Sequence, residues 1–420
     1  MNYVNFIDKN GNIFSVANNT SYTSFLVKDL TARIIRDFSI DEFKEIISNK
    51  SVKTSFYLYA LYDNETIKQD LTDYLLSKGS LSINYNCGMR RKLSISIFNA
   101  KNWKANPFDG FLWKGSKFKF EISIKTTLAE YIFPAGVFIL KDFEFPHKYK
   151  NNEINLELVD KFGGLDGTVG GKIADSIYIP KGSDIVQVVK SLLKTEKIEG
   201  VPYDVKTPIF PSWIYGATTP YTITESSEST IGSLIIKLMS LVNLDVFYDE
   251  YGRMCTEEMQ ENMLINYNPI LWAFSENDGL YSSHSNKVDL QSVENIIVVE
   301  GANINGDIIS ARVENTNPKS PTNITIFEPK IKKVVDENIS TIGDALLRAN
   351  YELFKSSVIP ISSSFSTTTI PMLDVNKVIA IDDDYCGLKN TKFLINSINI
   401  SITETPKMDM TINNLEEVTF

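Results

Sequence analysis

Apolar and polar side chains alternate in short runs through the first part of the chain. The alternation is clearest at residues 81–85 and, after a turn at 86–88, at residues 93–97. Because successive side chains of a strand point to opposite faces, this period of two predicts an antiparallel hairpin with one buried face. The same pattern predicts further strands at 118–124, 131–140 and 154–158.

Other segments repeat their apolar residues at helical spacing. From Asp184 the apolar positions recur at i, i+3, i+4, i+7 and i+8, which predicts an amphipathic helix capped by Ser183 or Asp184. Residues 230–242 and 340–354 show a similar pattern, and 39–47 predicts a short helix. Helices therefore interrupt a chain that consists mainly of strands.

The rest of the sequence pattern predicts turns, a loop and further strands. A turn at Pro134 and Gly136 is expected to break the segment 131–140 into two strands, and an exposed loop is expected at 314–323. Residues 1–28 read as an opening hairpin around Asp8–Gly11. Further strands are predicted at 244–248, 253–256, 293–300, 308–313, 359–368, 378–381, 393–400 and 408–415.

We therefore predict an α+β, β-rich fold. Residues 1–180 form a β-barrel or sandwich domain with one short helix, residues 181–265 form a small inserted α/β domain, and residues 266–420 form a second, barrel-like domain with a helix at about 340–356. A chain of 420 residues is long enough for several domains, each with its own core.

Charge and cysteine usage narrow the function. The 42 lysines and arginines are outnumbered by 52 acids, and a net charge of -10 argues against a protein that grips a phosphate backbone. Cys87, Cys255 and Cys386 lie far apart and predict reduced, isolated side chains. With no signal-peptide pattern and no apolar run of about 18 residues, we expect synthesis in the cytoplasm and no membrane segment.

Two groups of polar residues could carry chemistry, but a structural interpretation is favoured for each. His147 and His284 are the only histidines, and both are interpreted as isolated polar residues near turns. Asp382, Asp383 and Asp384 could begin a calcium loop. They lack the spacing of acids and the later glutamate that such a loop needs, which favours a solvated turn.

Three further candidates are equally weak. The glycine-rich segment 163–171 could bind an anion through its amides, but no Gly-Lys-Ser/Thr ending follows, so tight turns are favoured. Glu225 and Glu228 could be nominated for glycoside hydrolysis, yet nothing distinguishes them from ordinary capping acids. The basic residues 90–92 alternate between two faces, which favours ion pairs or a subunit contact over nucleic-acid binding. We predict no catalytic, cofactor-binding or metal-binding residues, and no enzyme.

Several of these segments follow one another in a recognisable order. A hairpin with two arginines at 90–91 precedes a Pro-x-Gly-x-Phe segment at 134–138 and an Asp-Lys-Phe…Leu-Asp-Gly turn at 160–167. The segments 249–253 and 344–353, followed by 370–376, fit the same order. Over residues 79–420 the chain resembles the tail-tip or baseplate hub proteins of tailed phages and phage-derived particles.

The resemblance implies both an architecture and partners. Hubs of this kind have two tail-tube-like β-barrels with an inserted small α/β domain, and a homotrimer forms a pseudo-sixfold ring under a sixfold tube. Such a ring lies in the virion tail, contacts distal tail or tube proteins above and tip, spike or fibre proteins below, and also meets a tape-measure protein. DNA or an effector passes through its channel without stable nucleic-acid binding, and no cofactor is implied.

Longer relatives carry a peptidoglycan hydrolase or receptor-binding extension. Because the chain ends at Phe420, directly after the last predicted strand, we expect no such domain here.

Two alternatives to the function of a structural hub stay open. A receptor- or carbohydrate-binding tail protein is indicated by 4 Trp and 19 Tyr, or by an exposed loop at 314–323. A cell-wall glycan hydrolase ranks lower, because it needs a pocket with converging acids.

Overall fold

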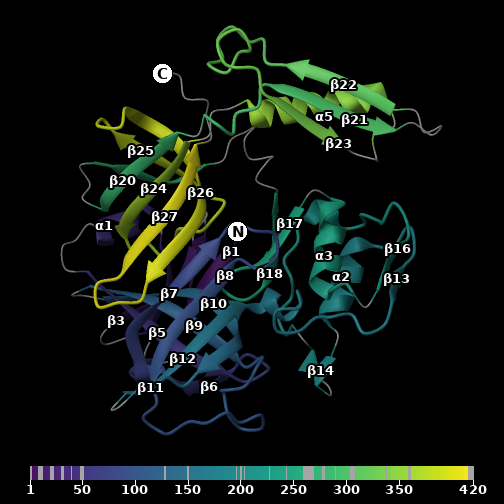
Figure 1. The fold of residues 1–420 in the computed structure, drawn as a ribbon. Helices are drawn as coiled ribbons and strands as arrows, with labels where there is room; N and C mark the ends of the chain where they lie inside the picture. Colours follow the sequence, from purple (N-terminus) through teal and green to yellow (C-terminus); the bar gives the residue numbers. More distant parts are fainter. Residues whose placement is uncertain are drawn as a thin grey trace.

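Strands dominate the described part of the chain, which confirms the predicted β-rich α+β class (Figure 1). The computed structural model describes residues 2–7, 13–18, 23–29, 33–38, 40–47, 52–126, 129–148, 151–194, 196–198, 201–202, 204–226, 228–242, 244–258, 269–276, 280–288, 290–302, 308–335, 339, 341–357 and 361–414. None of the described helices has the length and hydropathy needed to span a bilayer.

One 16-stranded sheet runs through both halves of the chain. Its main path is β20-β24-β27-β26-β7-β8-β12-β10-β9-β5-β6, and five more strands attach beside it. The strands are β3 Thr23–Asp29, β4 Arg33–Phe38, β5 Lys53–Leu61, β6 Ile67–Asp70, β7 Leu75–Asn84, β8 Arg91–Phe98, β9 Lys117–Lys125, β10 Ala129–Glu144, β11 His147–Lys148, β12 Asn151–Asp160, β19 Ile270–Ser275, β20 Tyr281–Val288, β24 Ile361–Thr368, β25 Val378–Asp383, β26 Leu388–Ser401 and β27 Lys407–Asn414.

The strands β3 to β12 form the first half of this sheet, and the strands β19, β20 and β24 to β27 form the second half. The two halves meet where β7 pairs with β26. Ile83 lies opposite Ile398 in this antiparallel pair, and Leu81 lies opposite Ile400. All four side chains belong to one core that spans both halves; its largest fully buried members are Phe43, Phe118, Phe120, Phe138, Trp272, Phe274, Phe365 and Phe393. The pairings of the described strands close neither half into a barrel, so the two barrels stay a prediction.

The segment predicted as two strands around a turn is one long strand. β10 runs without a break from Ala129 to Glu144, and its register against β9 shifts between Pro134 and Gly136. A β-bulge accommodates a proline, which has no N–H for the ladder. The turn prediction at this position was therefore wrong.

The start of the chain agrees with its pattern. β1 (Asn2–Ile7) and β2 (Ile13–Asn18) form the expected hairpin in a separate sheet, while its predicted turn lies outside the described residues. The short helix α1 spans Ile40–Ile47, and its Phe43 packs edge-on against Phe133 and Trp272. This helix therefore covers part of the main core.

Residues 162–258, which we call the insert, have a core of their own. Its helices α2 (Ile185–Leu193) and α3 (Ile231–Ser240) match the predicted ones and are capped by Asp184 and Thr230. The other elements of this part are η2 Lys161–Gly164, β13 Ile177–Ile179, β14 Glu196–Ile198, β15 Val201–Pro202, η3 Ser212–Ile214, β16 Ile223–Glu225, β17 Leu244–Tyr248 and β18 Met254–Glu258. A short η1 (Thr72–Tyr74) precedes β7.

Residues 290–357 form a further small unit, seen in light green away from the insert in Figure 1. The strand β21 (Ile296–Ala302) pairs antiparallel with β22 (Ile308–Glu314) and parallel with β23 (Ile331–Val335), and α5 (Ile342–Ser356) packs on them. The predicted second barrel domain therefore contains two cores, and the division into three domains at 180 and 265 stays a prediction.

The loop 314–323 differs from its prediction. Its tip is exposed, but Asn315, Ser320, Thr322 and Asn323 are buried. The Asn315 side-chain amide donates to the hydroxyls of Ser320 and Thr322. A hydrogen-bonded base thus holds the loop against its unit, so the expectation of an exposed loop was wrong for these four residues.

Candidate functional site: a buried ion network

Charged side chains are buried where the two halves of the sheet meet the insert. They come from the turn between β5 and β6, the starts of β8 and β9, the end of β12 with the residue after it, the insert, and the loop after residue 370. We call the following set the junction network: Glu65, Arg90, Arg91, Lys117, Asp160, Lys161, Asp204, Glu250, Glu257 and Asp374. Buried charges are expensive unless paired, so their contacts define this site.

Lys161 is the centre of one half of the network. Its Nζ lies 2.5 Å from Asp204 Oδ1 and 2.7 Å from Glu65 Oε1, and it donates to the Gly252 carbonyl at 3.0 Å. The side chain is 1% exposed. Since Glu65 and Gly252 belong to the first half and the insert respectively, Lys161 ties the insert to the sheet.

Glu65 forms ion pairs with three lysines. Lys117 and Lys206 approach its carboxylate at 3.2 Å and 3.1 Å, in addition to Lys161. Burial alone would raise the pKa of Glu65, but these lysines outweigh it and hold that pKa below its ordinary value. The carboxylate is therefore ionised at neutral pH and balances the surrounding cations.

Arg91 is the centre of the other half. Its guanidinium donates to the Tyr248 carbonyl at 2.6 Å and pairs with Asp374 at 2.5 Å, with Glu250 at 4.0 Å. Burial would lower the pKa of Arg91, but Asp374, Glu250 and Asp160 raise it above its ordinary value. Arg91 thus stays charged and links β8 to the insert and to the loop before β25.

Arg90 lies directly before β8 and contacts a different acid. Its guanidinium pairs with Glu257 at 2.5 Å and lies 3.9 Å from the centre of the Phe247 ring. A cation over an aromatic face is favourable, more so when both are removed from water. Lys92, the next residue, is exposed. The expectation that residues 90–92 form ion pairs is confirmed for both arginines.

Asp160 explains why the network begins at the end of β12. Its carboxylate accepts backbone hydrogen bonds from Arg90 and Arg91 at 2.7 Å and 2.9 Å, and from Phe162 at 3.0 Å. Burial raises the pKa of Asp160 to about 6, although these amides oppose the shift. One carboxylate therefore fixes the start of β8 and the turn that leads into the insert.

Gly252 brings the backbone of the insert close to the Val137 side chain of β10. It adopts a φ of 71° in the turn between β17 and β18, and a Cβ added there would lie 2.6 Å from Val137 Cβ. Only glycine fits both the left-handed conformation and the close approach.

We expect Gly252→Ala to lower the free energy of unfolding by about 2–4 kcal/mol, from overpacking and backbone strain together. Gly182→Ala is the matched control, because Gly182 has a φ of 84° with nothing within 4 Å of its added Cβ. It should lose only the strain, about 1–2 kcal/mol. Urea unfolding measures both, and equal losses would show that Gly252 has no packing role.

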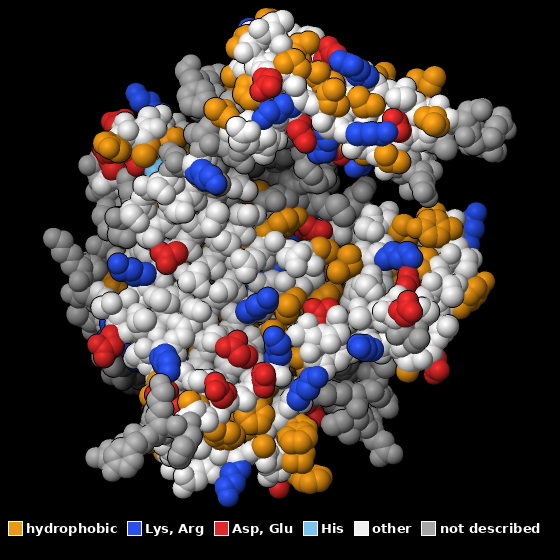
Figure 2. All heavy atoms as spheres, viewed as in Figure 1, with side chains coloured by type: hydrophobic (Ala, Val, Ile, Leu, Met, Phe, Trp, Pro, Cys, Tyr) orange, Lys and Arg blue, Asp and Glu red, His pale blue; other side chains and the backbone are white. Residues whose placement is uncertain are grey.

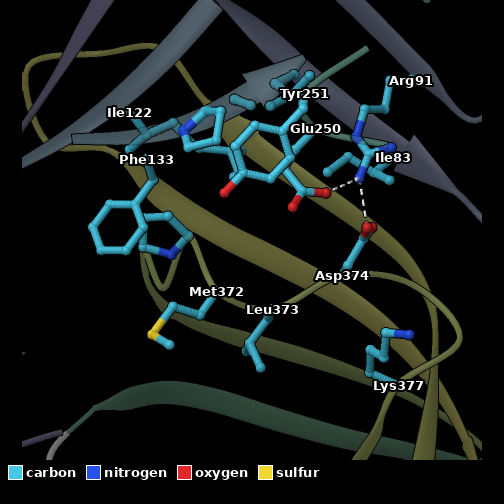
Figure 3. Close-up of a pocket in the computed structure, with 15 residues that line it drawn as sticks. Ile83, Arg91, Ile122, Phe133, Glu250, Tyr251, Met372, Leu373, Asp374 and Lys377 are labelled. Atoms are coloured by element: carbon cyan, nitrogen blue, oxygen red, sulfur yellow. Dashed lines mark hydrogen bonds and ion pairs between the residues drawn. The ribbon is translucent and has the colours of Figure 1, made fainter. Parts of the chain in front are cut away.

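A cavity of about 150 Å³ lies beside Arg91. Figure 3 shows Arg91 directed at Glu250 and Asp374, with Phe133 and Met372 on the apolar side. The pKa of Glu250 is raised by burial and by Asp374. Glu250 and Asp374 converge in space, as the two acids of a hydrolase do. Both, however, pair with the buried guanidinium of Arg91. The arrangement therefore has the character of an ion cluster that holds segments together.

The acids nominated from the sequence lie elsewhere. Glu225 pairs with Lys237 at 2.7 Å, and its pKa is lowered by that lysine and by Ser229. Glu228 is exposed. A general acid needs a raised pKa, so Glu225 is unsuited to that role. Sequence reasoning did not single out Glu250 and Asp374. The sequence pointed to them only in that they lie in the segments 249–253 and 370–376, which belong to the order of segments that resembles tail hubs.

The glycine-rich segment 163–171 forms tight turns, as predicted. The Val169 amide donates to the Gly163 carbonyl, and the Gly167 amide donates to the Gly170 carbonyl. The first amides of α3 are also occupied, because Ile231 donates to Gly171 O at 2.8 Å. A helix N-terminus whose amides are already paired has little to offer an anion.

The prediction for His284 was wrong. It lies within β20 rather than near a turn, its side chain is 2% exposed, and its Nδ1 is 3.3 Å from Asp383 Oδ2. Asp383 is buried too, whereas Asp382 and Asp384 are exposed, so the solvated-turn interpretation holds only for those two. His147 begins the short strand β11, and its side chain lies outside the described residues.

The main sheet is continuous through both halves, and buried ion pairs hold the insert against it. Comparison with solved structures places its fold among phage tail proteins. The 43 kDa tail protein of prophage MuSo2 from Shewanella oneidensis superposes with a TM-score of 0.56 and 13% identity, covering 86% of this chain and 98% of that one. A tail protein from Neisseria meningitidis MC58 gives 0.55 and 11%, covering 86% and 97%.

A third match is a chain of a protein complex. A chain of the PdpA-VgrG complex from Francisella gives a TM-score of 0.53 and 10% identity, covering 88% of this chain and 59% of that one. No protein-family model and no curated protein matches the sequence. The chain therefore has the tail-protein fold, and the resemblance to tail hubs seen in the sequence is confirmed at the level of the fold.

Proposed function

We propose that the chain is the structural hub of a phage or phage-derived tail tip. Three copies form a ring that closes the tail tube and adapts it to the tip or spike. The observation that carries this proposal is the junction network on a sheet continuous through both halves, in a chain whose fold matches a tail protein over 98% of that protein's length. In each copy, the two halves of the sheet act as two tube-like barrels.

The ions of the junction support a geometric role. A buried ion pair adds little net stability compared with apolar residues, but its loss leaves an uncompensated charge, so it favours one arrangement of its partners. Lys161 and Arg91 each contact two or more segments far apart in sequence. A hub needs such fixed geometry, because small errors in one subunit accumulate around a ring.

The charge of the chain fits a conduit. Its net charge of -10 repels the phosphates of DNA, so nucleic acid can pass through a channel without adhering. The acids at the cavity are paired with Arg91, which supports a role without turnover.

Light scattering of the purified protein tests the assembly. We expect a mass of three times 47.4 kDa, with tail-tube or spike proteins added if the chain alone stays monomeric. A stable dimer, or a chain that remains monomeric with both partners present, would contradict the ring.

A receptor- or carbohydrate-binding role is the second candidate. Four aromatic side chains on the insert are about half exposed or more: Tyr178, Trp213, Tyr215 and Tyr221. Apolar side chains also gather on the insert at the right of Figure 2. Exposed apolar groups of this kind mark interaction sites. Glycan binding that is lost on Trp213→Ala would favour this candidate, and no binding to host cell-surface glycans would remove it.

A further inference from the structure

Three side chains of metal-ligating type meet in the C-terminal part of the sheet. The ligand atoms of His284, Asp383 and Cys386 all lie within 4.8 Å of one another. Asp383 and Cys386 are three residues apart in the turn between β25 and β26, whereas His284 comes from β20, 99 residues earlier than Asp383. The junction network does not include this cluster.

The distance between His284 and Asp383 suits two ligands of one metal ion. His284 Nδ1 and Asp383 Oδ2 are 3.3 Å apart, longer than a strong charge-assisted hydrogen bond. Two ligands bound at 2.0–2.1 Å to a tetrahedral zinc ion are separated by about 3.3–3.4 Å. The thiol of Cys386 supplies the soft ligand that favours zinc over calcium or magnesium.

The imidazole is under-satisfied for a buried histidine. Its side chain is 2% exposed, and Nε2 has no hydrogen-bond partner among the described residues. The ring packs against Phe365 with centroids 5.9 Å apart, so water has little access from that side. A buried polar ring with one long contact needs another explanation than an ordinary core histidine.

The turn fixes the other two ligands. The Cys386 amide donates to Asp383 Oδ1 at 3.1 Å, which orients the carboxylate toward His284, and Gly387 follows with a φ of 70°. Hydrogen bonds of this type orient first-shell ligands at metal sites.

We propose that His284, Asp383 and Cys386 bind a zinc-class divalent ion that fastens β20 to the β25–β26 turn. Among the described pairings, β20 pairs with β24, and β25 pairs with β19 and β26, so no ladder joins β20 to β25. Both strands lie in the same C-terminal region of the sheet (Figure 1). The ion closes this side of the sheet as a structural clip.

The test uses the full chain, freed of metal with a chelator and titrated with Zn²⁺. We expect one tightly bound zinc per chain by elemental analysis and a higher melting temperature with zinc than without. Co²⁺ in place of zinc should give the visible absorption of a tetrahedral thiolate site. Cys386→Ser and His284→Gln, confirmed as folded by circular dichroism, should each lower zinc affinity at least tenfold.

Cys87→Ser is the matched control, because Cys87 is a free, partly buried cysteine of the insert junction. It should bind zinc as the wild type does. The proposal is overturned if the wild-type chain binds no zinc at micromolar concentration, if Cys386→Ser binds it unchanged, or if Cys87→Ser loses it equally. The hub proposal does not depend on this result.

Discussion

Lys161→Met is expected to lower the free energy of unfolding by about 3–5 kcal/mol, because it leaves Asp204 buried without its cation and removes one of the three lysines that pair with Glu65. Methionine keeps most of the volume of the lysine stem, so the loss reports on charge rather than on a cavity. Urea unfolding followed by tryptophan fluorescence measures the difference.

Lys237→Met is the matched control for this prediction. Lys237 also pairs with a glutamate, at 2.7 Å from Glu225, but its side chain is 45% exposed. An exposed pair contributes about 0–1 kcal/mol, so this substitution should change stability little. Losses of similar size for Lys161 and Lys237 would show that the buried lysine has no special place in the junction.

Arg91→Met is expected to have an effect of similar size, about 3–5 kcal/mol. The substitution leaves Asp374 without its buried partner and the Tyr248 carbonyl without its donor. Because these groups belong to the second half and the insert, we also expect proteases to cut the chain faster at the borders of the insert. Urea unfolding and limited proteolysis measure the two effects.

Lys92→Met is the control for this second prediction. It changes the adjacent residue of the same basic cluster, but Lys92 is exposed, so its loss should alter stability by no more than about 0.5 kcal/mol. If Arg91→Met is as stable and as resistant to proteases as Lys92→Met, the junction network does not hold the insert.

The sequence predicted the local elements well because their signals are local. The capped helices at Asp184 and Thr230 and the hairpin of β7 with β8 follow from spacing and capping within a few residues. The unbroken strand β10 was missed, because a proline and a glycine indicate a turn and a bulge equally well.

The junction network could not be assembled from the sequence in the same way. Arg91 and Asp374 are 283 residues apart, and among the described strands the pairing of β7 with β26 joins the two halves that carry them. The cluster at His284 was missed for the same reason, since its other two members lie in a turn about a hundred residues later. The sequence indicated that residues 90–91 form ion pairs, but not which acids are their partners.

The position of the chain in an assembled particle tests the central claim most directly. Electron micrographs of tailed particles from cells that encode this chain, labelled with an antibody against it, provide this measurement. We expect the antibody to label the tip of the tail tube, which in a phage is the end remote from the capsid. Labelling along the whole tube, labelling of the capsid alone, or particles that lack the chain altogether would contradict a tail-tip hub.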